Sequence, residues 1–191
     1  MRIIGGEARG HRLRAPCGHA TRPTSDRVRE AIFDIIGPPP AQAAVLDLFA
    51  GSGAMGLEAL SRGADRAVFV EKDQAALHVL HANIASLGLG DRTRVMPSPA
   101  GSSLRRLHRE DHGFAWIFVD PPYAGSEGPA TLALLGDPFR SLCVEGALVV
   151  LEHDQRRPPA QEYGVLSLVD QRRYGDTGVS FYRNALEIVG E

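Results

Sequence analysis

The chain has 191 residues, of which 43% are hydrophobic and 23% are charged. These values are typical of one soluble globular domain and exclude a fibrous or disordered chain. The sequence lacks the run of about 20 apolar residues that spans a bilayer, and its first residues lack the apolar stretch of a signal peptide. We therefore expect a cytoplasmic protein. Two cysteines exclude a disulfide framework. The seven histidines show neither HxxxH nor HxH spacing, so we expect no metal.

The net charge of −2 does not by itself indicate a nucleic-acid partner, but its distribution is uneven. Residues 1–30 contain seven arginines against three acidic residues, a local charge of +4, whereas residues 31–191 carry −6. A basic segment on an acidic body predicts a polyanionic partner that is contacted through the segment. The candidate phosphate-binding residues are Arg9, Arg12, Arg14, Arg22, Arg27 and Arg29. The alternative is that this basic end is merely solvated.

The first forty residues predict a small extension with its own local structure. Residues 1–16 are typical of a short hairpin, since residues 2–4 are mostly apolar, Gly5-Gly6 can turn and residues 10–14 can return. Thr24 or Ser25 can cap a helix that continues to about Ile36. Its apolar stripe at helical spacing comprises Val28, Ile32, Ile35 and Ile36. The sequence Gly37-Pro38-Pro39-Pro40 then ends the helix, so we expect an extension over 1–40 and a second domain over 41–191.

From residue 43 the pattern alternates between strands and helices. The predicted strands are 45–49, 67–71, 93–96, 115–119, 147–152, 165–173 and 179–185, and the predicted helices include 55–62 and one from Asp73 to about Leu87. Alternation of this kind indicates an α/β fold, a mostly parallel, doubly wound sheet with helices on both faces. The last two strands flank the turn 174–178 and predict an antiparallel hairpin.

A glycine motif joins the first strand to the helix that follows. Gly51, Gly53 and Gly56 satisfy GxGxxG, and Glu71 lies 20 residues after Gly51 at the end of the second strand. This combination is typical of a site for a nucleotide-type cofactor, because glycines allow the backbone to approach the ligand and the acid accepts hydrogen bonds from ribose hydroxyls. The motif alone does not distinguish NAD, FAD and S-adenosylmethionine.

Asp47 favours S-adenosylmethionine among these cofactors. It lies four residues before Gly51, at the carboxyl end of the strand. A carboxylate there would repel a pyrophosphate, whereas S-adenosylmethionine carries an ammonium and a sulfonium and no phosphate. The alternative role for Asp47 is a structural cap on the loop. The alternative role for Glu71 is that of a solvated strand end.

The fourth strand ends in Asp120-Pro121-Pro122-Tyr123. Asp120 can accept one N–H bond from an exocyclic base amine and the Pro121 carbonyl can accept another, which would orient the nitrogen lone pair for methyl transfer. Pro122 limits the backbone freedom of the motif, and Tyr123 offers a ring on which a flipped base can stack. The alternative is a proline-rich turn followed by a core tyrosine. In parallel sheets, ligands bind at the carboxyl ends of the strands, so this motif at the end of the fourth strand is expected beside the cofactor.

These motifs resemble a known family along nearly the whole chain. RIIGGEARGHRL, TRPTSDRVREAIFDII, LDLFAGSGAMGLEALSRGA and FVDPPY are together similar, in order, to the bacterial 16S rRNA (guanine(966)-N2)-methyltransferases, RsmD. The resemblance implies a Rossmann-like sheet of seven strands, the cofactor S-adenosylmethionine, and a guanine N2 of 16S rRNA as substrate. It implies that Asp120 to Tyr123 are catalytic.

The resemblance also implies which residues hold the cofactor. The loop around Gly51 and Gly53, with Phe49 and Ser52, would surround it, and Glu71 would contact its ribose. Related enzymes often place Asp or Asn after the third strand to contact the cofactor adenine, where this chain has Ser98. They often place an apolar residue at the position of Lys72, whose aliphatic stem can take the same role.

The partner implied by the resemblance is 16S rRNA, within the small ribosomal subunit or an assembly intermediate, and we expect the protein to be a monomer. Three other functions stay open on the residues alone. A DNA adenine-N6 or cytosine-N4 amino-methyltransferase would use the same DPPY, although the chain has no room after its core for a target-recognition region. A non-catalytic RNA-binding protein would not need Asp120, and a dehydrogenase is disfavoured by Asp47.

Overall fold

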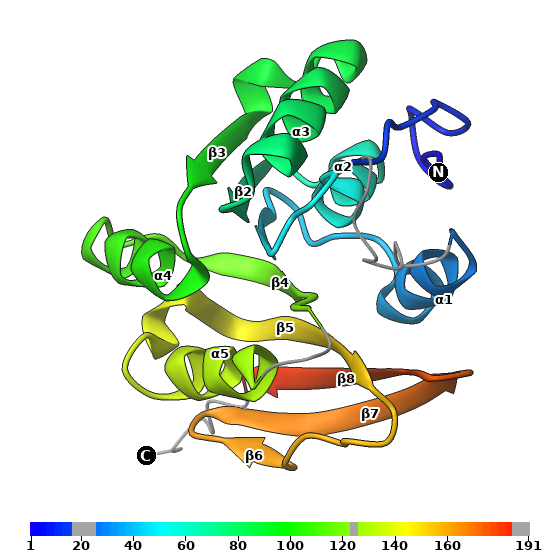
Figure 1. Ribbon diagram of the computed structural model, residues 1–191. Coiled ribbons are helices and arrows are strands. Elements are labelled where there is room, and N and C mark those ends of the chain that lie inside the picture. Colours follow the sequence, from blue (N-terminus) through cyan, green and yellow to red (C-terminus); the bar gives the residue numbers. More distant parts are fainter. Residues whose placement is uncertain (17–25, 123–125, 185–191) are drawn as a thin grey trace. The chain divides into compact units, whose positions relative to one another are not determined.

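A computed structural model describes residues 1–16, 26–122 and 126–184. The chain forms two compact units, Met1–Ala100 and Gly101–Glu191, and each is described by itself (Figure 1). Within the described ranges, none of the helices is both long enough and apolar enough to cross a membrane. Cys143 is a free thiol, and its burial raises its pKa to about 12. Several residues named from the sequence lie outside the described residues: Cys17, Arg22, the expected helix caps Thr24 and Ser25, and Tyr123.

The first unit is built on three parallel strands in the order β3-β2-β1. Its strands are β1 (Ala44–Leu48), β2 (Arg66–Glu71) and β3 (Thr93–Pro97). Its helices are α1 (Asp26–Ile36), α2 (Ala54–Ser61), α3 (Gln74–Leu87) and the short 3-10 helix η1 (Gly90–Arg92). All five residues of β1 are buried, as expected for a strand covered on both faces.

Local capping explains where α3 begins and ends. The Asp73 side chain accepts a hydrogen bond from the Ala76 N–H at 2.9 Å, and Gly88 adopts the left-handed conformation after the last turn. The predicted cap at Asp73 and end near Leu87 are therefore confirmed. Helix α1 differs from its prediction, because Val28, Arg29, Ile32 and Phe33 are buried while Ile35 is 42% exposed. The buried face is thus rotated toward Arg29 and Phe33.

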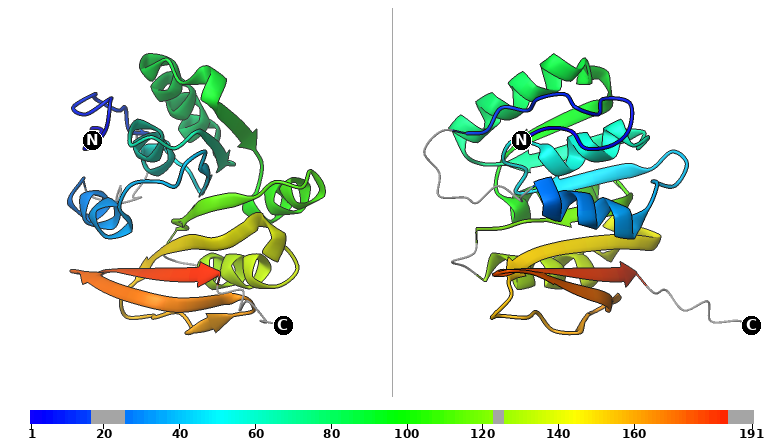
Figure 2. Two further views of the ribbon diagram at one scale, coloured as in Figure 1. Left: turned by 180° about the vertical axis from the view of Figure 1, so that it is seen from behind. Right: turned by 90° about the vertical axis from the view of Figure 1, so that its right-hand side faces the viewer.

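The N-terminal segment folds against α2 and α3. Arg2 and Arg12 form an antiparallel bridge, which confirms a short hairpin within residues 1–16. The amides of Ile4 and Gly5 donate to Glu58 of α2 at 2.8 and 2.7 Å. His11 lies 3.1 Å from the Ser86 hydroxyl of α3. Figure 2 shows the same segment running beside both helices.

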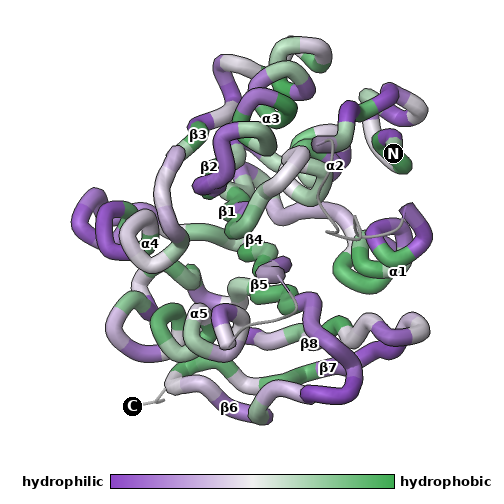
Figure 3. The backbone as a smooth tube through the Cα atoms, viewed as in Figure 1, coloured by the Kyte–Doolittle hydropathy of each residue, from purple (hydrophilic) through white to green (hydrophobic). Residues whose placement is uncertain are grey.

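The second unit combines one parallel pair of strands with an antiparallel extension. β4 (Phe114–Val119) pairs in parallel with β5 (Cys143–Asp154). The other three strands are β6 (Glu162–Tyr163), β7 (Leu166–Tyr174) and β8 (Thr177–Asn184). They extend the pair with antiparallel pairing in the order β5-β8-β7-β6. The helices are α4 (Ala100–Arg109), α5 (Glu127–Gly136) and the 3-10 helix η2 (Arg140–Leu142). Figure 3 shows hydrophobic residues concentrated along β4 and β5.

The mixed α/β class with a C-terminal antiparallel hairpin is confirmed. Tyr174 pairs with Thr177, so Gly175 and Asp176 form a two-residue turn, and Gly175 has the positive φ that such turns favour. β5 begins four residues earlier than predicted, at Cys143 rather than Ala147. Among the described residues there is one strand more than the seven that were predicted. It is β6, whose two residues are too few to give a sequence pattern.

Candidate functional site

The glycine loop between β1 and α2 uses each of its glycines differently. Gly51 has a φ of 54°, and a Cβ there would have no neighbour closer than the Phe49 carbonyl oxygen at 4.0 Å. Gly53 and Gly56 instead serve packing, since a Cβ would lie 2.4 Å from Leu80 Cδ1 and from the Phe69 ring, respectively. The loop therefore packs tightly against its own unit at two positions and leaves open space at Gly51, as a ligand-binding backbone requires.

Asp47 is a buried acid at the carboxyl end of β1. Its Oδ2 accepts a hydrogen bond from the Gly56 N–H in the first turn of α2 at 2.9 Å. The structural role that the sequence left open, a cap on the loop, is thus present as a hydrogen bond to the start of α2, where Gly53 has no side chain to supply one. Burial raises the pKa of Asp47 to about 7, against the lowering effect of the Gly56 bond and with a further increase from nearby Glu71.

Glu71, at the end of β2, holds the glycine loop with its carboxylate. One oxygen accepts the Gly51 N–H at 2.8 Å, and the other accepts the Lys72 and Asp73 N–H groups at 2.7 and 2.8 Å. It is half-buried rather than a solvated strand end. A carboxylate offers about four acceptor positions, so these three bonds fix its orientation and leave acceptor capacity for a ligand.

The other candidate cofactor residues are placed on the same edge of the first unit. Half-buried Phe49 has a φ of 63°, Ser52 is buried in the glycine loop, and Lys72 is exposed. Ser98 follows β3, and the last residues of β2 and β3 are paired through Glu71 and Pro97. The carboxyl ends of the three parallel strands thus bring together the residues that the sequence predicted for one site.

Asn83 of α3 supports this loop, and the sequence analysis missed it. Its side-chain amide donates to the Ser52 and Arg14 carbonyls at 2.9 and 3.1 Å, and its oxygen accepts the Arg14 N–H at 2.9 Å. The side chain is 1% exposed. It therefore ties the glycine loop to the N-terminal segment. An asparagine in the interior of a helix carries no spacing signal by which sequence reasoning finds such a role.

The Asp120-Pro121-Pro122 motif directly follows β4 in the second unit. Asp120 is half-buried, Pro121 is buried and Pro122 is exposed. Pro121 packs close to α5, since a Cβ on Gly128 would lie 3.3 Å from Pro121 Cγ. The absence of a side chain at position 128 therefore allows the motif to lie against the first turn of α5.

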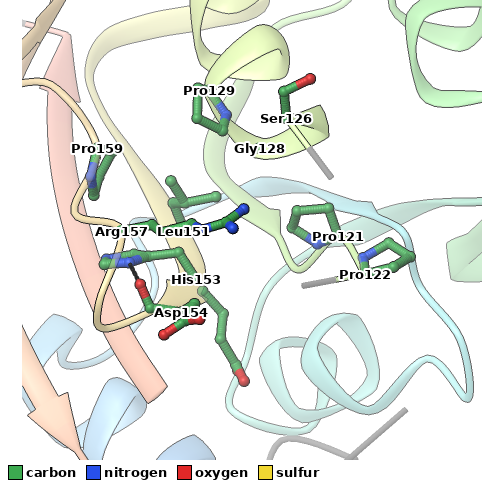
Figure 4. A pocket seen from close by; sticks show the side chains of 11 residues that line it. Pro121, Pro122, Ser126, Gly128, Pro129, Leu151, His153, Asp154, Arg157 and Pro159 are labelled. Atoms are coloured by element: carbon green, nitrogen blue, oxygen red, sulfur yellow. Dashed lines mark hydrogen bonds between the residues drawn. The ribbon is translucent and has the colours of Figure 1, made fainter. Parts of the chain in front are cut away.

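A pocket of about 310 Å³ opens beside this motif (Figure 4). Four prolines supply apolar walls, and the end of β5 with the following loop supplies polar groups. The prolines are Pro121, Pro122, Pro129 and Pro159, and the other lining residues are Ser126, Gly128, Leu151, Glu152, His153, Asp154 and Arg157. An apolar enclosure with a few polar groups is the usual form of a small-ligand site.

A hydrogen-bond network fixes the polar end of this pocket. His153 Nδ1 lies 2.9 Å from the Asp154 carbonyl oxygen, to which it can only donate, so in the neutral ring Nε2 accepts from the Ser180 hydroxyl at 2.9 Å. Gln171 donates to the same hydroxyl at 2.8 Å. Asp154 pairs with Arg156 at 2.9 Å, and that guanidinium lowers the pKa of Asp154 to about 2. These bonds hold the end of β5 in one conformation.

The predicted basic segment is largely at the surface, with one correction. Arg9, Arg12, Arg14 and Arg27 are exposed. Arg29 is 0% exposed and is therefore not available to a phosphate. Its guanidinium pairs with Asp26 at 3.0 Å and Glu58 at 3.5 Å, and it also donates to the Arg2 carbonyl. The correction arises because the N-terminal segment covers the helix face on which Arg29 lies.

Comparison with known proteins relates this chain to proteins of similar sequence and fold. The profile described as "Conserved hypothetical protein 95" matches residues 1–183. The ribosomal RNA small subunit methyltransferase D of Escherichia coli (strain K12) is 42% identical over 81% of this chain and 75% of the relative. The putative rRNA methyltransferase YlbH of Bacillus subtilis (strain 168) is 39% identical over 96% of this chain and 98% of the relative. The solved structure of the putative methyltransferase yhhF from Escherichia coli superposes on this chain with a TM-score of 0.83 and 35% sequence identity. The superposition covers 96% of this chain and 97% of that structure. The chain therefore belongs to the family described as conserved hypothetical protein 95, the family of the ribosomal RNA small subunit methyltransferases D.

Proposed function

We propose that this chain transfers a methyl group from S-adenosylmethionine to the N2 amine of a guanine in 16S rRNA. The observation that carries the proposal is the Asp120-Pro121-Pro122 motif at the end of β4, beside a pocket with apolar walls, in a chain of this family. The family includes a relative named for methylation of small-subunit ribosomal RNA. The choice of guanine N2 rests on the resemblance of the N-terminal and DPPY segments to the guanine-N2 enzymes.

The residues of the first unit suit S-adenosylmethionine. The open space at Gly51 admits a ligand close to the backbone. Asp47 can attract the cofactor ammonium, and Glu71 has acceptor capacity for the ribose hydroxyls. The proposed cofactor site is completed by Phe49, Ser52, Gly53, Lys72 and Ser98. The cofactor supplies an electrophilic methyl group.

The catalytic task of the chain is to orient a weak nucleophile. The lone pair of an exocyclic amine is delocalised into the base, so the nitrogen must be held with its N–H groups engaged and its lone pair directed outward. Asp120 and the Pro121 carbonyl are the acceptors that we assign to these N–H groups, and Tyr123 is assigned to stack on the base. The N–C bond would form as the methyl–sulfonium bond breaks, which leaves positive charge on the nitrogen, and Asp120 would stabilise that charge until the amine loses one proton to solvent.

We further propose that residues 1–40 act as an RNA-contacting extension of the catalytic domain 41–191, and that the protein acts as a monomer on a small subunit or an assembly intermediate. Folded RNA would supply much of the recognition, with the target base in a loop from which it can be unstacked at low cost.

The experiment that tests the function identifies the methylated nucleoside. The protein and labelled S-adenosylmethionine are incubated with unmethylated small subunits, with naked 16S rRNA and with duplex DNA, and the products are digested and separated. We expect N2-methylguanosine from ribosomal RNA. An Asp120→Ala variant serves as the control for contaminating enzymes. Labelled N6-methyladenosine, or methylation of the duplex DNA alone, contradicts the proposal.

The raised pKa of Asp47 predicts a pH-dependent cofactor affinity. With a pKa of about 7, Asp47 is mostly protonated at pH 6 and mostly ionised at pH 8. Because the cofactor ammonium favours the ionised form, affinity should increase with pH over this window, by at most about tenfold per pH unit. Binding near pH 6 should release a proton. Calorimetric titration in two buffers with different ionisation enthalpies measures both effects.

The control for this prediction is Asp47→Asn, whose amide oxygen can still accept the Gly56 N–H. The variant should bind the cofactor more weakly at pH 8 and lose the pH dependence. An unchanged pH profile in the variant would assign the titration to another group.

The exposed arginines of the N-terminal segment predict a salt-dependent RNA interaction. Replacing Arg9, Arg12 and Arg14 by alanine should weaken RNA binding and shallow its log–log salt dependence by about 0.7–0.9 for each lost phosphate contact. Cofactor affinity should stay within a few-fold of the unmodified protein. The matched control replaces Arg66, Arg140 and Arg183, which are also exposed and remove the same charge. Equal slopes in the two triple variants would show that only net charge matters.

A further inference from the structure

Glu152 is a buried acid that the proposed mechanism leaves without a role. It lies near the end of β5, is 5% exposed and lines the pocket beside the Asp120 motif. β4 and β5 are parallel, and their last paired residues are Val119 and Leu151. Asp120 directly follows the last residue of β4, and Glu152 follows Leu151 within β5. Corresponding residues of neighbouring parallel strands lie on the same face, about 5 Å apart. Continued by one residue, this register places Asp120 next to Glu152, and Glu152 lines the pocket.

Two neighbouring carboxylates suit the hydrogen-bonding edge of guanine and no other amino base. Guanine presents N1–H and the N2 amine next to each other, and both are donors. Adenine and cytosine present their amine next to a ring nitrogen that has a lone pair and no hydrogen. An ionised carboxylate is an acceptor only. A carboxylate opposite the ring nitrogen therefore attracts guanine and repels the other two bases.

We propose that Glu152 selects guanine by accepting the N1–H while Asp120 and the Pro121 carbonyl engage the N2 amine. The inference rests on the proposed function and names the group that sets its base specificity. The pocket is suited to a flat base, since its prolines offer apolar walls and its volume of about 310 Å³ is at the small end of ligand sites. The network of His153, Ser180 and Gln171 positions the strand end that carries Glu152.

The test uses 2-aminopurine, which has the same N2 amine as guanine but a lone pair at N1. Small subunits are reconstituted with 16S rRNA that carries either guanosine or 2-aminopurine riboside at the nucleotide methylated by the protein. The initial rates on the two substrates are compared. We expect the unmodified protein to prefer guanosine by about tenfold to a hundredfold, the scale of one well-placed base contact.

The decisive variant is Glu152→Gln, whose amide can either accept from N1–H or donate to the N1 lone pair. We expect the preference for guanosine to shrink at least fivefold, with a gain in the relative rate on 2-aminopurine. The matched control is Glu145→Gln, which removes an exposed carboxylate of the same strand outside the pocket lining and should keep the full preference. Cofactor titration and thermal unfolding of both variants establish that they are folded.

The outcomes separate the inference from the function on which it rests. If the unmodified protein forms no N2-methylguanosine on the guanosine substrate, the proposed function and the inference both fail. If it methylates guanosine and 2-aminopurine equally well, the inference alone fails, whatever the variants do. An unchanged preference in folded Glu152→Gln, or an equal loss in Glu145→Gln, also overturns the inference.

Discussion

Replacing Asp120 by alanine is expected to reduce methyl transfer by about 100-fold to 1,000-fold, the usual cost of removing one group that stabilises developing charge. The alanine variant leaves the base amine with the Pro121 carbonyl as its remaining acceptor, so the lone pair is poorly oriented. Asp120→Asn should lose less, because its amide oxygen still accepts a hydrogen bond. Single-turnover rates on small subunits, with the cofactor saturating, measure the effect on chemistry separately from binding.

The control for Asp120 is Glu71→Gln in the first unit. Asp120→Ala should keep its cofactor affinity within a few-fold, since we assign Asp120 to the base. Glu71→Gln should weaken cofactor binding by about 1–3 kcal/mol, the range for losing hydrogen bonds to a charged group. The structure adds a reason, because Glu71 also holds the Gly51 amide. Equal losses of cofactor affinity in the two variants would refute this division of roles.

Local sequence patterns were sufficient to predict the elements that carry the site. The buried strand β1, the glycines after it and Glu71 at the end of β2 follow from spacing and chain order, because a strand, a tight turn and a helix are each specified by neighbouring residues. The cap at Asp73 and the hairpin turn at Gly175 are local in the same sense. Such features need no knowledge of what packs against them.

Contacts between distant segments could not be predicted in this way. Arg29 lies off the apolar stripe read from the sequence, which predicted exposure, yet the N-terminal segment covers it. Asn83 acquires its role from Arg14 and Ser52, which are 69 and 31 residues away. Glu152 lies at the end of a strand that the sequence predicted, and the position that we infer for it beside Asp120 depends on the register of β4 and β5. Each of these roles follows from tertiary pairing.

The ion pair between Arg29 and Glu58 is the tertiary contact whose loss is expected to affect stability most. Both side chains are 0% exposed. Glu58 also accepts the Ile4 and Gly5 amides and pairs with Arg62 at 2.8 Å. Removing the Glu58 carboxylate leaves the buried guanidinium with the partly exposed Asp26 as a weaker partner, so its charge is poorly compensated, at a cost of up to about 3–5 kcal/mol. We therefore expect Glu58→Gln to lower the free energy of unfolding by that amount, as measured by urea denaturation.

Two further variants decide whether this loss comes from the buried charge. The double variant Glu58→Gln with Arg29→Met removes both charges, and it should recover at least half of the lost stability, because an apolar side chain of similar volume replaces the uncompensated guanidinium. The control is Glu110→Gln, which breaks the exposed pair of Arg106 and Glu110 at 2.8 Å and should cost less than about 1 kcal/mol. If Glu58→Gln costs no more than Glu110→Gln, or if adding Arg29→Met deepens the loss, Arg29 does not depend on Glu58 for its charge compensation. The N-terminal segment would then be held mainly by its backbone hydrogen bonds.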